Sequence, residues 1–440
     1  MNDEAEQPSL RYAWYVIGVL FLAYTFSYID RQILALLVKP VRADLGLSDT
    51  QFSLLVGFAF GIFYTLMGIP LGRMADRGNR RNIMAAGVAL WSLMTALCGI
   101  AQNFWQLFLT RIGVGVGEAA LSPAAYSLIA DYFPANRLAR ALATYSTGVY
   151  AGAGLAYIVG GLVISALTDS PQLDLPVIGM TRSWQVVFFM VGLPGLLVAL
   201  LMFSVKEPLR KNMGGVTQRN VGLKQLADFV YERRSIFVAH FAGFALLALI
   251  FNAVAVWMPA HFMRNFNYDA GQFGIHFGLI IAVFGSAGIV CGGWFGDWLA
   301  TKGYKDASMR AATLGATGLI PFVIITPLIT NVNVAMVLLC PLIFFSSFPY
   351  GVAAAALQLV TPNRMRGQVS ALYLFVVNLA GVATAPTITA LVTDYVFQDD
   401  LKVGYSIALV TGIAAPVSAI ILSRTWKPFR EEYAKIVAAD

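Results

Sequence analysis

Residues Gly72-Arg-Met-Ala-Asp-Arg-Gly-Asn-Arg-Arg81 end one apolar stretch, residues 51–74, and lead into the next, residues 82–101. Each of these stretches is long enough to cross a lipid bilayer. A related sequence, Gly293-Trp-Phe-Gly-Asp297, ends another apolar stretch 221 residues later. A charged connection that returns at a corresponding place indicates that the chain consists of two related halves.

Two further features repeat at nearly the same distance. Pro123 and Pro349 lie 226 residues apart, and so do Arg140 and Arg366. Three pairs at nearly one offset support an internal duplication.

The composition is that of a polytopic membrane protein. Of 440 residues, 58% are hydrophobic and 12% are charged, and the mean hydropathy is +0.71; soluble proteins have about 25% charged residues. Twelve segments have bilayer length: residues 12–38, 51–74, 82–101, 104–130, 138–168, 184–205, 236–262, 272–300, 308–330, 333–359, 367–395 and 403–425. The sequence therefore predicts twelve membrane spans, divided six and six.

A basic segment separates the two sets of spans. Residues 206–235 contain seven Lys and Arg residues, and Leu223, Leu226, Phe229 and Val230 form one apolar helical stripe. We predict an N-terminal six-helix half over residues 1–205, a cytoplasmic linker with an interfacial helix over 206–235, and a C-terminal six-helix half with a short tail over 236–440.

The distribution of Lys and Arg predicts the orientation. In this layout 23 of the 30 Lys and Arg residues fall on the side that carries both termini, and five fall on the other side. Because cytoplasmic connections are enriched in Lys and Arg, both termini are predicted to be cytoplasmic, in a plasma membrane of the bacterial inner type. The net charge of +7 then reflects topology, and no nucleic-acid partner is expected.

The fourth predicted span contains two charges. Its sequence Arg111-Ile-Gly-Val-Gly-Val-Gly-Glu118 places Arg111 and Glu118 on one helix face, two turns apart. The three intervening glycines would allow a helix or a ligand to approach closely. Charges in lipid are costly, so both side chains should face the protein interior or a water-filled cavity. They could form a structural ion pair, or they could form a titratable site on a transport pathway.

The first predicted span carries a second pair of charges, Asp30 and Arg31. Neighbouring residues diverge by about 100° on a helix, so at least one of the two needs a partner elsewhere. Asp30 and Arg111 have similar predicted depths and could meet, in a purely structural pair or in a proton-coupled one. We hypothesise that Glu118 takes and releases a coupling proton, while Arg111, Arg31 or both attract an anionic head group.

The C-terminal half offers mainly neutral polar and aromatic side chains in mid-membrane. The predicted cavity is therefore charged on one wall and largely apolar on the other, which suits an amphiphile better than a sugar. Its predicted lining is Tyr28, Tyr126, Asn252, Ser347, Tyr350, Tyr373 and Asn378. The sequence has no phosphate-binding Gly-rich motif and no catalytic or metal-binding constellation, so we expect no enzymatic activity, no cofactor and no metal.

The connection Gly72–Arg81 closely resembles the signature loop of the major facilitator superfamily, with Asn79 where that loop usually has glycine. The resemblance implies an all-α integral membrane fold of twelve transmembrane helices in two pseudo-symmetric six-helix bundles. It also implies that Asp76 acts as a cytoplasmic latch against the start of span eleven, near Arg137 or Arg140. The predicted cytoplasmic gate comprises Gly72, Asp76, Arg77, Arg80, Arg81, Arg137, Arg140 and Asp297.

Within this superfamily the chain resembles the Spinster branch, through Tyr28-Ile-Asp-Arg31, the segment from Arg111 to Glu118-Ala119, and Asp131-Tyr-Phe-Pro134. The resemblance implies alternating access and proton linkage. We expect a lipid-like, anionic amphiphile as substrate and a protein that functions as a monomer. Leu121-Ser-Pro-Ala124 departs from the animal members of the branch. A sugar-acid, organic-anion or drug carrier of the superfamily is the alternative, and a membrane sensor that does not transport is a further one.

Overall fold

The structure is a computed structural model, and it describes residues 9–133, 135–167, 172–175, 179–208, 223–362 and 365–439. Twelve helical stretches in it are long and apolar enough to cross a membrane. The predicted number of spans and the all-α fold are therefore confirmed. The structure adds one element that the sequence did not indicate, a two-stranded antiparallel hairpin in which Gln172 pairs with Arg182.

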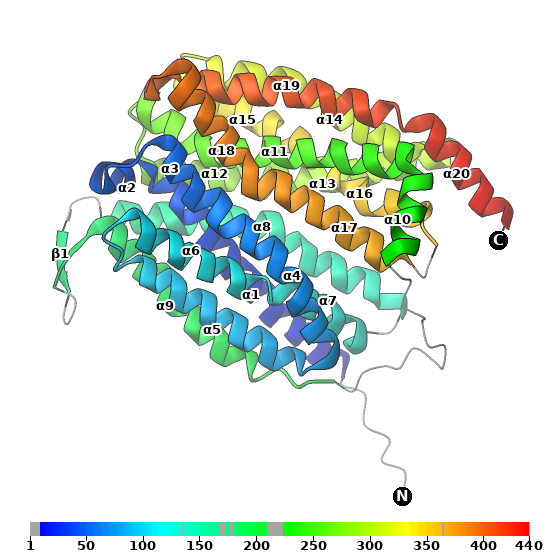
Figure 1. Cartoon of the computed structure of the whole chain (residues 1–440), viewed down its shortest axis with the longest axis horizontal. Coiled ribbons are helices and arrows are strands. Elements are labelled where there is room, and N and C mark those ends of the chain that lie inside the picture. The colour runs from blue at the N-terminus through cyan, green and yellow to red at the C-terminus, as the bar shows by residue number, and fades with distance from the viewer. Residues whose placement is uncertain are drawn as a thin grey trace, which may run out of the picture. The chain divides into compact units, whose positions relative to one another are not determined.

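The chain divides into two compact units (Figure 1). Unit 1 comprises Met1–Leu47, Leu54–Gly215 and Asp269–Gly278, and unit 2 comprises Ser48–Ser53, Val216–Tyr268 and Leu279–Asp440. The units follow the two halves of the chain except at two short segments. The first residues of span two belong to unit 2, and the first residues of span eight belong to unit 1.

Unit 1 contains most of the first six spans. Its elements are α1 (Leu10–Leu36), α2 (Val38–Leu45), the π-helical turn η1 (Leu54–Phe58), α4 (Ala59–Arg77), α5 (Arg80–Cys98), α6 (Phe104–Glu118), α7 (Leu121–Tyr132), α8 (Ala135–Leu167), β1 (Gln172–Leu175), β2 (Gly179–Arg182) and α9 (Ser183–Met202), and α12 (Ala270–Ile280) begins in it. Helix α1 packs on α8, and α5 packs on α6 and α9. Asn79, in the loop Gly72–Arg81, caps α5 by accepting a hydrogen bond from the main-chain N–H of Asn82 at 2.9 Å.

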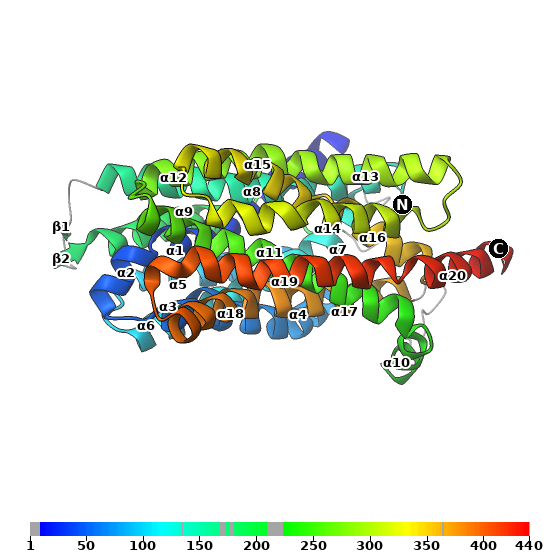
Figure 2. The ribbon, with the colours of Figure 1, turned by 90° about the horizontal axis from the view of Figure 1, so that it is seen from above.

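Unit 2 contains the linker helix and most of the last six spans. Its elements are α3 (Asp49–Ser53), α10 (Leu223–Glu232), α11 (Arg234–Asn265), η2 (Ile281–Gly285), α13 (Ser286–Thr301), α14 (Ala307–Ile325), η3 (Thr326–Leu328), α15 (Val332–Ser347), α16 (Tyr350–Leu359), α17 (Arg366–Asn378), η5 (Leu379–Thr384), α18 (Ala385–Leu391), η6 (Val392–Phe397), η7 (Asp400–Lys402), α19 (Val403–Ser423) and α20 (Trp426–Ala439). Figure 2 shows α14, α11 and α19 running side by side, and α19 packs against both of the others.

The fourth span and the corresponding tenth span are both interrupted near their middle. The fourth span breaks between Glu118 and Leu121, and the tenth breaks between Ser347 and Tyr350. Pro123 and Pro349 explain why, because proline lacks the N–H that would continue the helical hydrogen bonds and its ring displaces an earlier carbonyl. The break places Glu118 at a helix end within its span.

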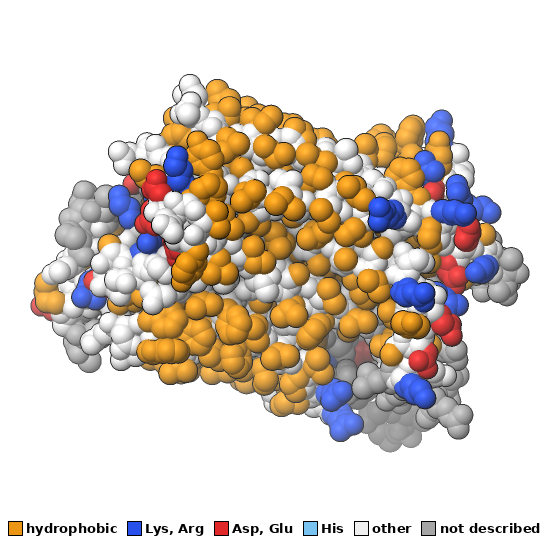
Figure 3. Space-filling view, turned by 45° about the horizontal axis from the view of Figure 1, so that its top comes forward, with side chains coloured by type: hydrophobic (Ala, Val, Ile, Leu, Met, Phe, Trp, Pro, Cys, Tyr) orange, Lys and Arg blue, Asp and Glu red, His pale blue; other side chains and the backbone are white. Residues whose placement is uncertain are grey.

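The second and eighth spans also share a feature. A π-helical turn lies at Leu54–Phe58 in one and at Ile281–Gly285 in the other, so the duplication extends to local backbone geometry. Such turns are rare and often occur at functional sites. On the face shown in Figure 3, hydrophobic side chains form a broad field, and charged side chains gather toward its two ends, as expected for a surface in contact with lipid.

The glycines of the fourth span bring other helices close. A Cβ atom on Gly115 would lie 2.5 Å from the Phe60 carbonyl oxygen in α4, and one on Gly117 would lie 2.7 Å from the Trp91 main-chain nitrogen in α5. Spans two, three and four are therefore joined at glycine contacts around the charged residues.

This packing predicts that Gly115→Ala destabilises the protein by about 1–3 kcal/mol, because the added methyl group overpacks against main-chain atoms. Gly18→Ala is the matched control, since no heavy atom lies within 4 Å of the methyl position in α1. Thermal unfolding in detergent compares the two. Equal unfolding temperatures would show that the contact between α4 and α6 is not close-packed.

Candidate functional site

Glu118 is the centre of a buried polar cluster in unit 1. Its side chain lies at the end of α6 and is 1% exposed. Oε2 accepts a hydrogen bond from Arg31 Nε at 2.5 Å and another from the Ser27 hydroxyl at 2.5 Å. Oε1 has no hydrogen-bond partner among the described residues. The predicted intramembrane carboxylate is thus held on one oxygen and left free on the other.

Aromatic rings surround the partner of Glu118. The Arg31 guanidinium lies 5.0 Å from the ring centre of Tyr28, 4.9 Å from that of Phe60 and 4.5 Å from that of Tyr64. These cation–π contacts favour the charged guanidinium away from water. The arrangement keeps Arg31 in a fixed position in which it can hold an anion.

Arg111 is completely buried and binds main-chain oxygens rather than a carboxylate. Its Nη1 donates to the Asp30 carbonyl oxygen at 3.2 Å, and its Nε donates to the Leu55 carbonyl oxygen at 3.4 Å. Arg111 Nη2 and Asp30 Oδ1 are buried without a partner among the residues that the structure describes. The structure thus brings Arg111 and Asp30 together, but the pair that shares an ion-pair contact is Arg31 and Glu118.

The cluster contains two carboxyl groups and two guanidinium groups, of which Asp30, Arg111 and Glu118 are buried and Arg31 is partly exposed. Among the described residues, three of their polar atoms have no hydrogen-bond partner, and an unpaired buried polar atom is costly. A proton or an anion that enters the cluster can therefore exchange partners within it. This is the chemistry that a site coupling protons to a second ion requires.

Some members of the cluster were not predicted from the sequence. Ser27, Phe60 and Tyr64 all contact Glu118 or Arg31. Ser27 lies one turn before Arg31 on the same helix, which is a signal that could have been used. Phe60 and Tyr64 come from another span, and their spacing resembles that of ordinary lipid-facing residues.

The predicted cavity residues differ in exposure. Tyr126 is 40% exposed and Tyr373 is 7% exposed. Tyr28, Asn252, Tyr350 and Asn378 are intermediate. Ser347 corrects the prediction: it is completely buried, its hydroxyl donates to the Ile343 carbonyl oxygen at 2.9 Å, and its Cβ packs against Gly288 of α13. A serine bonded to its own helix is typical of a packed span, so Ser347 does not line a cavity in this structure.

The predicted gate residues also separate into groups. Arg80 is 1% exposed, forms an ion pair with Asp131, and donates to Glu207 Oε1 at 2.7 Å. It therefore joins the end of α7 to the segment after α9 inside unit 1. The Arg81 main-chain N–H also donates to Glu207, at 3.0 Å.

Other predicted gate residues are exposed, partly exposed or not among the described side chains. Arg77, Arg137 and Asp297 are exposed, and Gly72 is intermediate. The side chains of Asp76 and Arg140 lie outside the described residues, so the predicted Asp76 latch stays a prediction.

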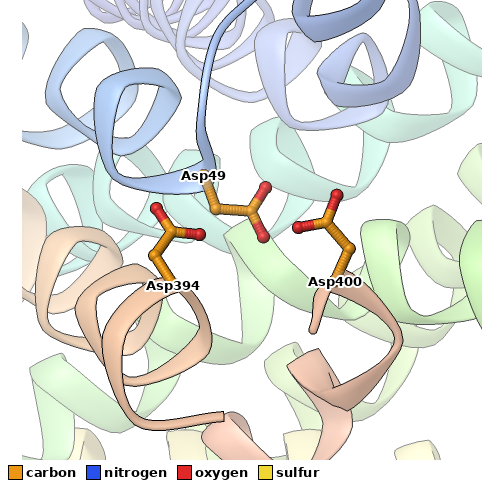
Figure 4. A group of neighbouring side chains, drawn as sticks. All are labelled: Asp49, Asp394 and Asp400. Atoms are coloured by element: carbon orange, nitrogen blue, oxygen red, sulfur yellow. The ribbon is translucent and has the colours of Figure 1, made fainter. Parts of the chain in front are cut away.

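Unit 2 contains a group of three neighbouring acidic residues. Asp49, Asp394 and Asp400 have carboxylate oxygens within 4.8 Å of one another, as Figure 4 shows. Arg264 binds both oxygens of Asp49, at 2.6 and 2.7 Å, and Asp394 accepts the Thr50 main-chain N–H at 2.7 Å. Protein donors therefore bind the carboxylates of Asp49 and Asp394, and the ion pair of Asp49 with Arg264 attaches the first turn of span two to span seven.

We predict that Asp49→Asn destabilises the protein by about 3 kcal/mol, because it leaves the mostly buried Arg264 without its bidentate partner. Thermal unfolding in detergent measures the loss. Asp228→Asn removes an exposed carboxylate on α10 of the same unit and should leave the unfolding temperature unchanged. Equal behaviour of the two variants would contradict a stabilising role for the pair.

Comparison with known proteins agrees with this geometry. The sequence profile of the Major Facilitator Superfamily matches residues 20–386. An MFS-type efflux pump of Mycolicibacterium smegmatis is 29% identical in an alignment of 431 positions that covers 95% of this chain and 94% of the pump. Protein spinster homolog 1 of Xenopus tropicalis is 29% identical in an alignment of 417 positions that covers 88% of this chain and 74% of that protein.

A solved structure has the same fold. A bacterial homologue of the human lysosomal transporter Spinster, in an inward-facing and unoccupied conformation, superposes with a TM-score of 0.76. The alignment covers 98% of this chain and 99% of that one, at 24% identity. The profile match over most of the chain and the twelve apolar helices lead to one conclusion: this chain is an integral membrane protein that belongs to the major facilitator superfamily.

Proposed function

We propose that the protein is a proton-linked secondary transporter that works by alternating access and moves an anionic amphiphile. The observation that carries the proposal is the ion pair between the buried Glu118 and Arg31, in which one carboxylate oxygen has no hydrogen-bond partner among the residues that the structure describes. An intramembrane acid beside a fixed arginine marks an ion or proton pathway by default. The superfamily to which the chain belongs supports transport rather than catalysis.

The proposed mechanism is an exchange of partners. When an anionic head group binds Arg31, the Glu118 carboxylate loses its cation and a proton on Glu118 becomes favourable. When the head group leaves, Arg31 returns to Glu118 and the proton is released. Each pKa unit of change corresponds to about 1.4 kcal/mol of coupling, so a modest rearrangement is sufficient to link the two events.

The aromatic side chains near Arg31 support the proposal that the substrate is an amphiphile. Tyr24 lies 5.2 Å from Tyr28 and stacks on Tyr145 at 4.9 Å, and Tyr145 lies 5.4 Å from the half-exposed Tyr126. A run of rings therefore leads from the Arg31 site toward the surface of unit 1. Such rings present apolar faces with few polar groups, which suits an acyl or aromatic tail behind a charged head.

We also propose an inner-type plasma membrane with both termini in the cytoplasm, on the basis of the Lys and Arg distribution. Each copy of the chain contains a whole polar cluster within unit 1, which supports function as a monomer. Protons, the substrate and the lipid bilayer are the partners that this proposal requires.

A second candidate is an organic-anion or drug carrier. The similarity to an MFS-type efflux pump over nearly the whole chain favours it. The two candidates share the Arg31 and Glu118 chemistry and differ in the apolar part of the substrate.

Uptake into proteoliposomes under an imposed pH gradient tests the proposal. The probes are radiolabelled lysophosphatidic acid, an anionic amphiphile, and gluconate, a hydrophilic anion. Accumulation of lysophosphatidic acid that a protonophore abolishes is the expected result. Accumulation of gluconate alone would favour the second candidate, and gradient-independent distribution of both probes would contradict proton-linked transport.

A further inference from the structure

Thr95 of α5 differs from three other threonines in the spans of unit 1. Thr25, Thr65 and Thr110 each donate to the main-chain carbonyl four residues earlier, at 2.7 to 3.1 Å. This is how a threonine inside a membrane helix ordinarily satisfies its hydroxyl. Thr95 is completely buried, and its Oγ1 has no hydrogen-bond partner among the described residues. Its hydroxyl is therefore available to a group outside its own helix.

Helix packing places Thr95 at the level of the charged cluster. Cys98 donates to the Thr110 hydroxyl at 3.2 Å, and a Cβ atom on Gly113 would lie 2.5 Å from Met94 Cγ. These contacts fix the antiparallel register of α5 and α6, so Thr95 lies beside the turn that carries Arg111.

Asp30 is the acid that interacts with Thr95. The Thr95 hydroxyl lies beside the Asp30 carboxyl group, and Asp30 Oδ1, like Thr95 Oγ1, is buried without a hydrogen-bond partner among the described residues. The other charged or titratable groups that face Asp30 are Arg31 of α1, Arg111 and Glu118 of α6, and Cys98 of α5.

We infer that Thr95 is a positioning residue of the proton-coupled site, which holds the Asp30 carboxyl group and serves it in both protonation states. A hydroxyl group can donate to a carboxylate and can accept from a carboxylic acid. Arginine can only donate, so Arg111 and Arg31 cannot accept the O–H of the protonated carboxyl group. The inference rests on the proposed function, because it assigns Asp30 to the site that exchanges protons.

Infrared spectroscopy of the protein in lipid, recorded against pH, tests the inference without a substrate. The carboxylic acid band that disappears in Asp30→Asn reports the protonation of Asp30. Thr95→Val keeps the shape of the side chain and removes the hydroxyl. Thr95→Val loses the hydrogen bond to both forms of the carboxyl group, and the bond to the charged form is the stronger one. We therefore expect the midpoint of this band to move toward higher pH by about one unit.

Two variants separate positioning from packing. Thr95→Ser retains the hydroxyl and should restore the wild-type midpoint. Ser92→Ala removes another buried hydroxyl from the same helix, one that faces Gly195 of α9, and should leave the midpoint unchanged. If Thr95→Val does not fold, Thr95→Ala takes its place.

A midpoint that is the same in Thr95→Val and wild type would overturn the inference, and so would an equal shift in Ser92→Ala. The result does not depend on flux. If the midpoint depends on Thr95 but the protein shows no proton-driven uptake, the positioning role of Thr95 stands and the transport proposal is refuted.

Discussion

Glu118→Gln is expected to abolish uphill accumulation of the substrate while leaving the protein folded. Glutamine has nearly the shape of glutamate, and its amide oxygen can still accept hydrogen bonds from Ser27 and Arg31, but it cannot bind a proton. For one proton per substrate, a gradient of two pH units can drive an accumulation of about 100-fold. The variant should bring the substrate only to equal concentrations. Proteoliposome uptake with and without a protonophore measures the difference.

Glu232→Gln is the matched control for this experiment. The Glu232 side chain is 70% exposed and pairs with Arg233, so its loss should leave accumulation at the wild-type level. Exchange of labelled for unlabelled substrate, which needs no net proton movement, should persist in Glu118→Gln. Uphill accumulation by Glu118→Gln would remove this residue from the coupling site.

Arg80→Ala is expected to cause the largest loss of stability, about 3–5 kcal/mol. The Arg80 side chain is 1% exposed, and besides Asp131 and Glu207 it binds the Ser127 hydroxyl at 3.0 Å. Removing the cation leaves two mostly buried carboxylates without it, in addition to the lost packing. Thermal unfolding in detergent, followed by intrinsic tryptophan fluorescence, should show a clearly lower unfolding temperature.

Arg77→Ala provides the comparison, because Arg77 comes from the same loop and is exposed. A small effect in Arg77→Ala and a large one in Arg80→Ala would show that the basic residues of this loop have different roles. If the two variants unfold alike, the ion pairs of Arg80 contribute little stability.

The spans and the repeat could be predicted from the sequence because they depend on composition and on local chain chemistry. Long apolar stretches have no stable alternative to a membrane helix, and Pro123 and Pro349 interrupt their helices wherever those helices pack. The charged residues of the site could also be recognised in the sequence. Charges within a membrane span are costly in lipid, and the apolar stretches contain Asp30, Arg31, Arg111 and Glu118.

The pairing of these residues was not predictable in the same way. Depth along the helices favoured Asp30 with Arg111, yet the rotation of each helix about its axis decides which side chains meet. Glu118 reaches Arg31, and Arg111 turns to carbonyl oxygens. Rotation depends on close packing, here at Gly115 and Gly117, and sequence spacing within a single span does not determine it. Ser347 shows the same limit, since its burial follows from its contact with Gly288 of another helix.

The central claim is that Glu118 is the proton-linked switch. Its most direct test is the distance between spin labels at Arg77 of unit 1 and Lys302 of unit 2, two exposed positions, recorded against pH in lipid nanodiscs. Wild type and Glu118→Gln are compared without substrate. If Glu118 is the switch, the distance populations shift with pH in wild type and stay constant in the variant. Equal shifts in both proteins would contradict it and would place the titrating group elsewhere.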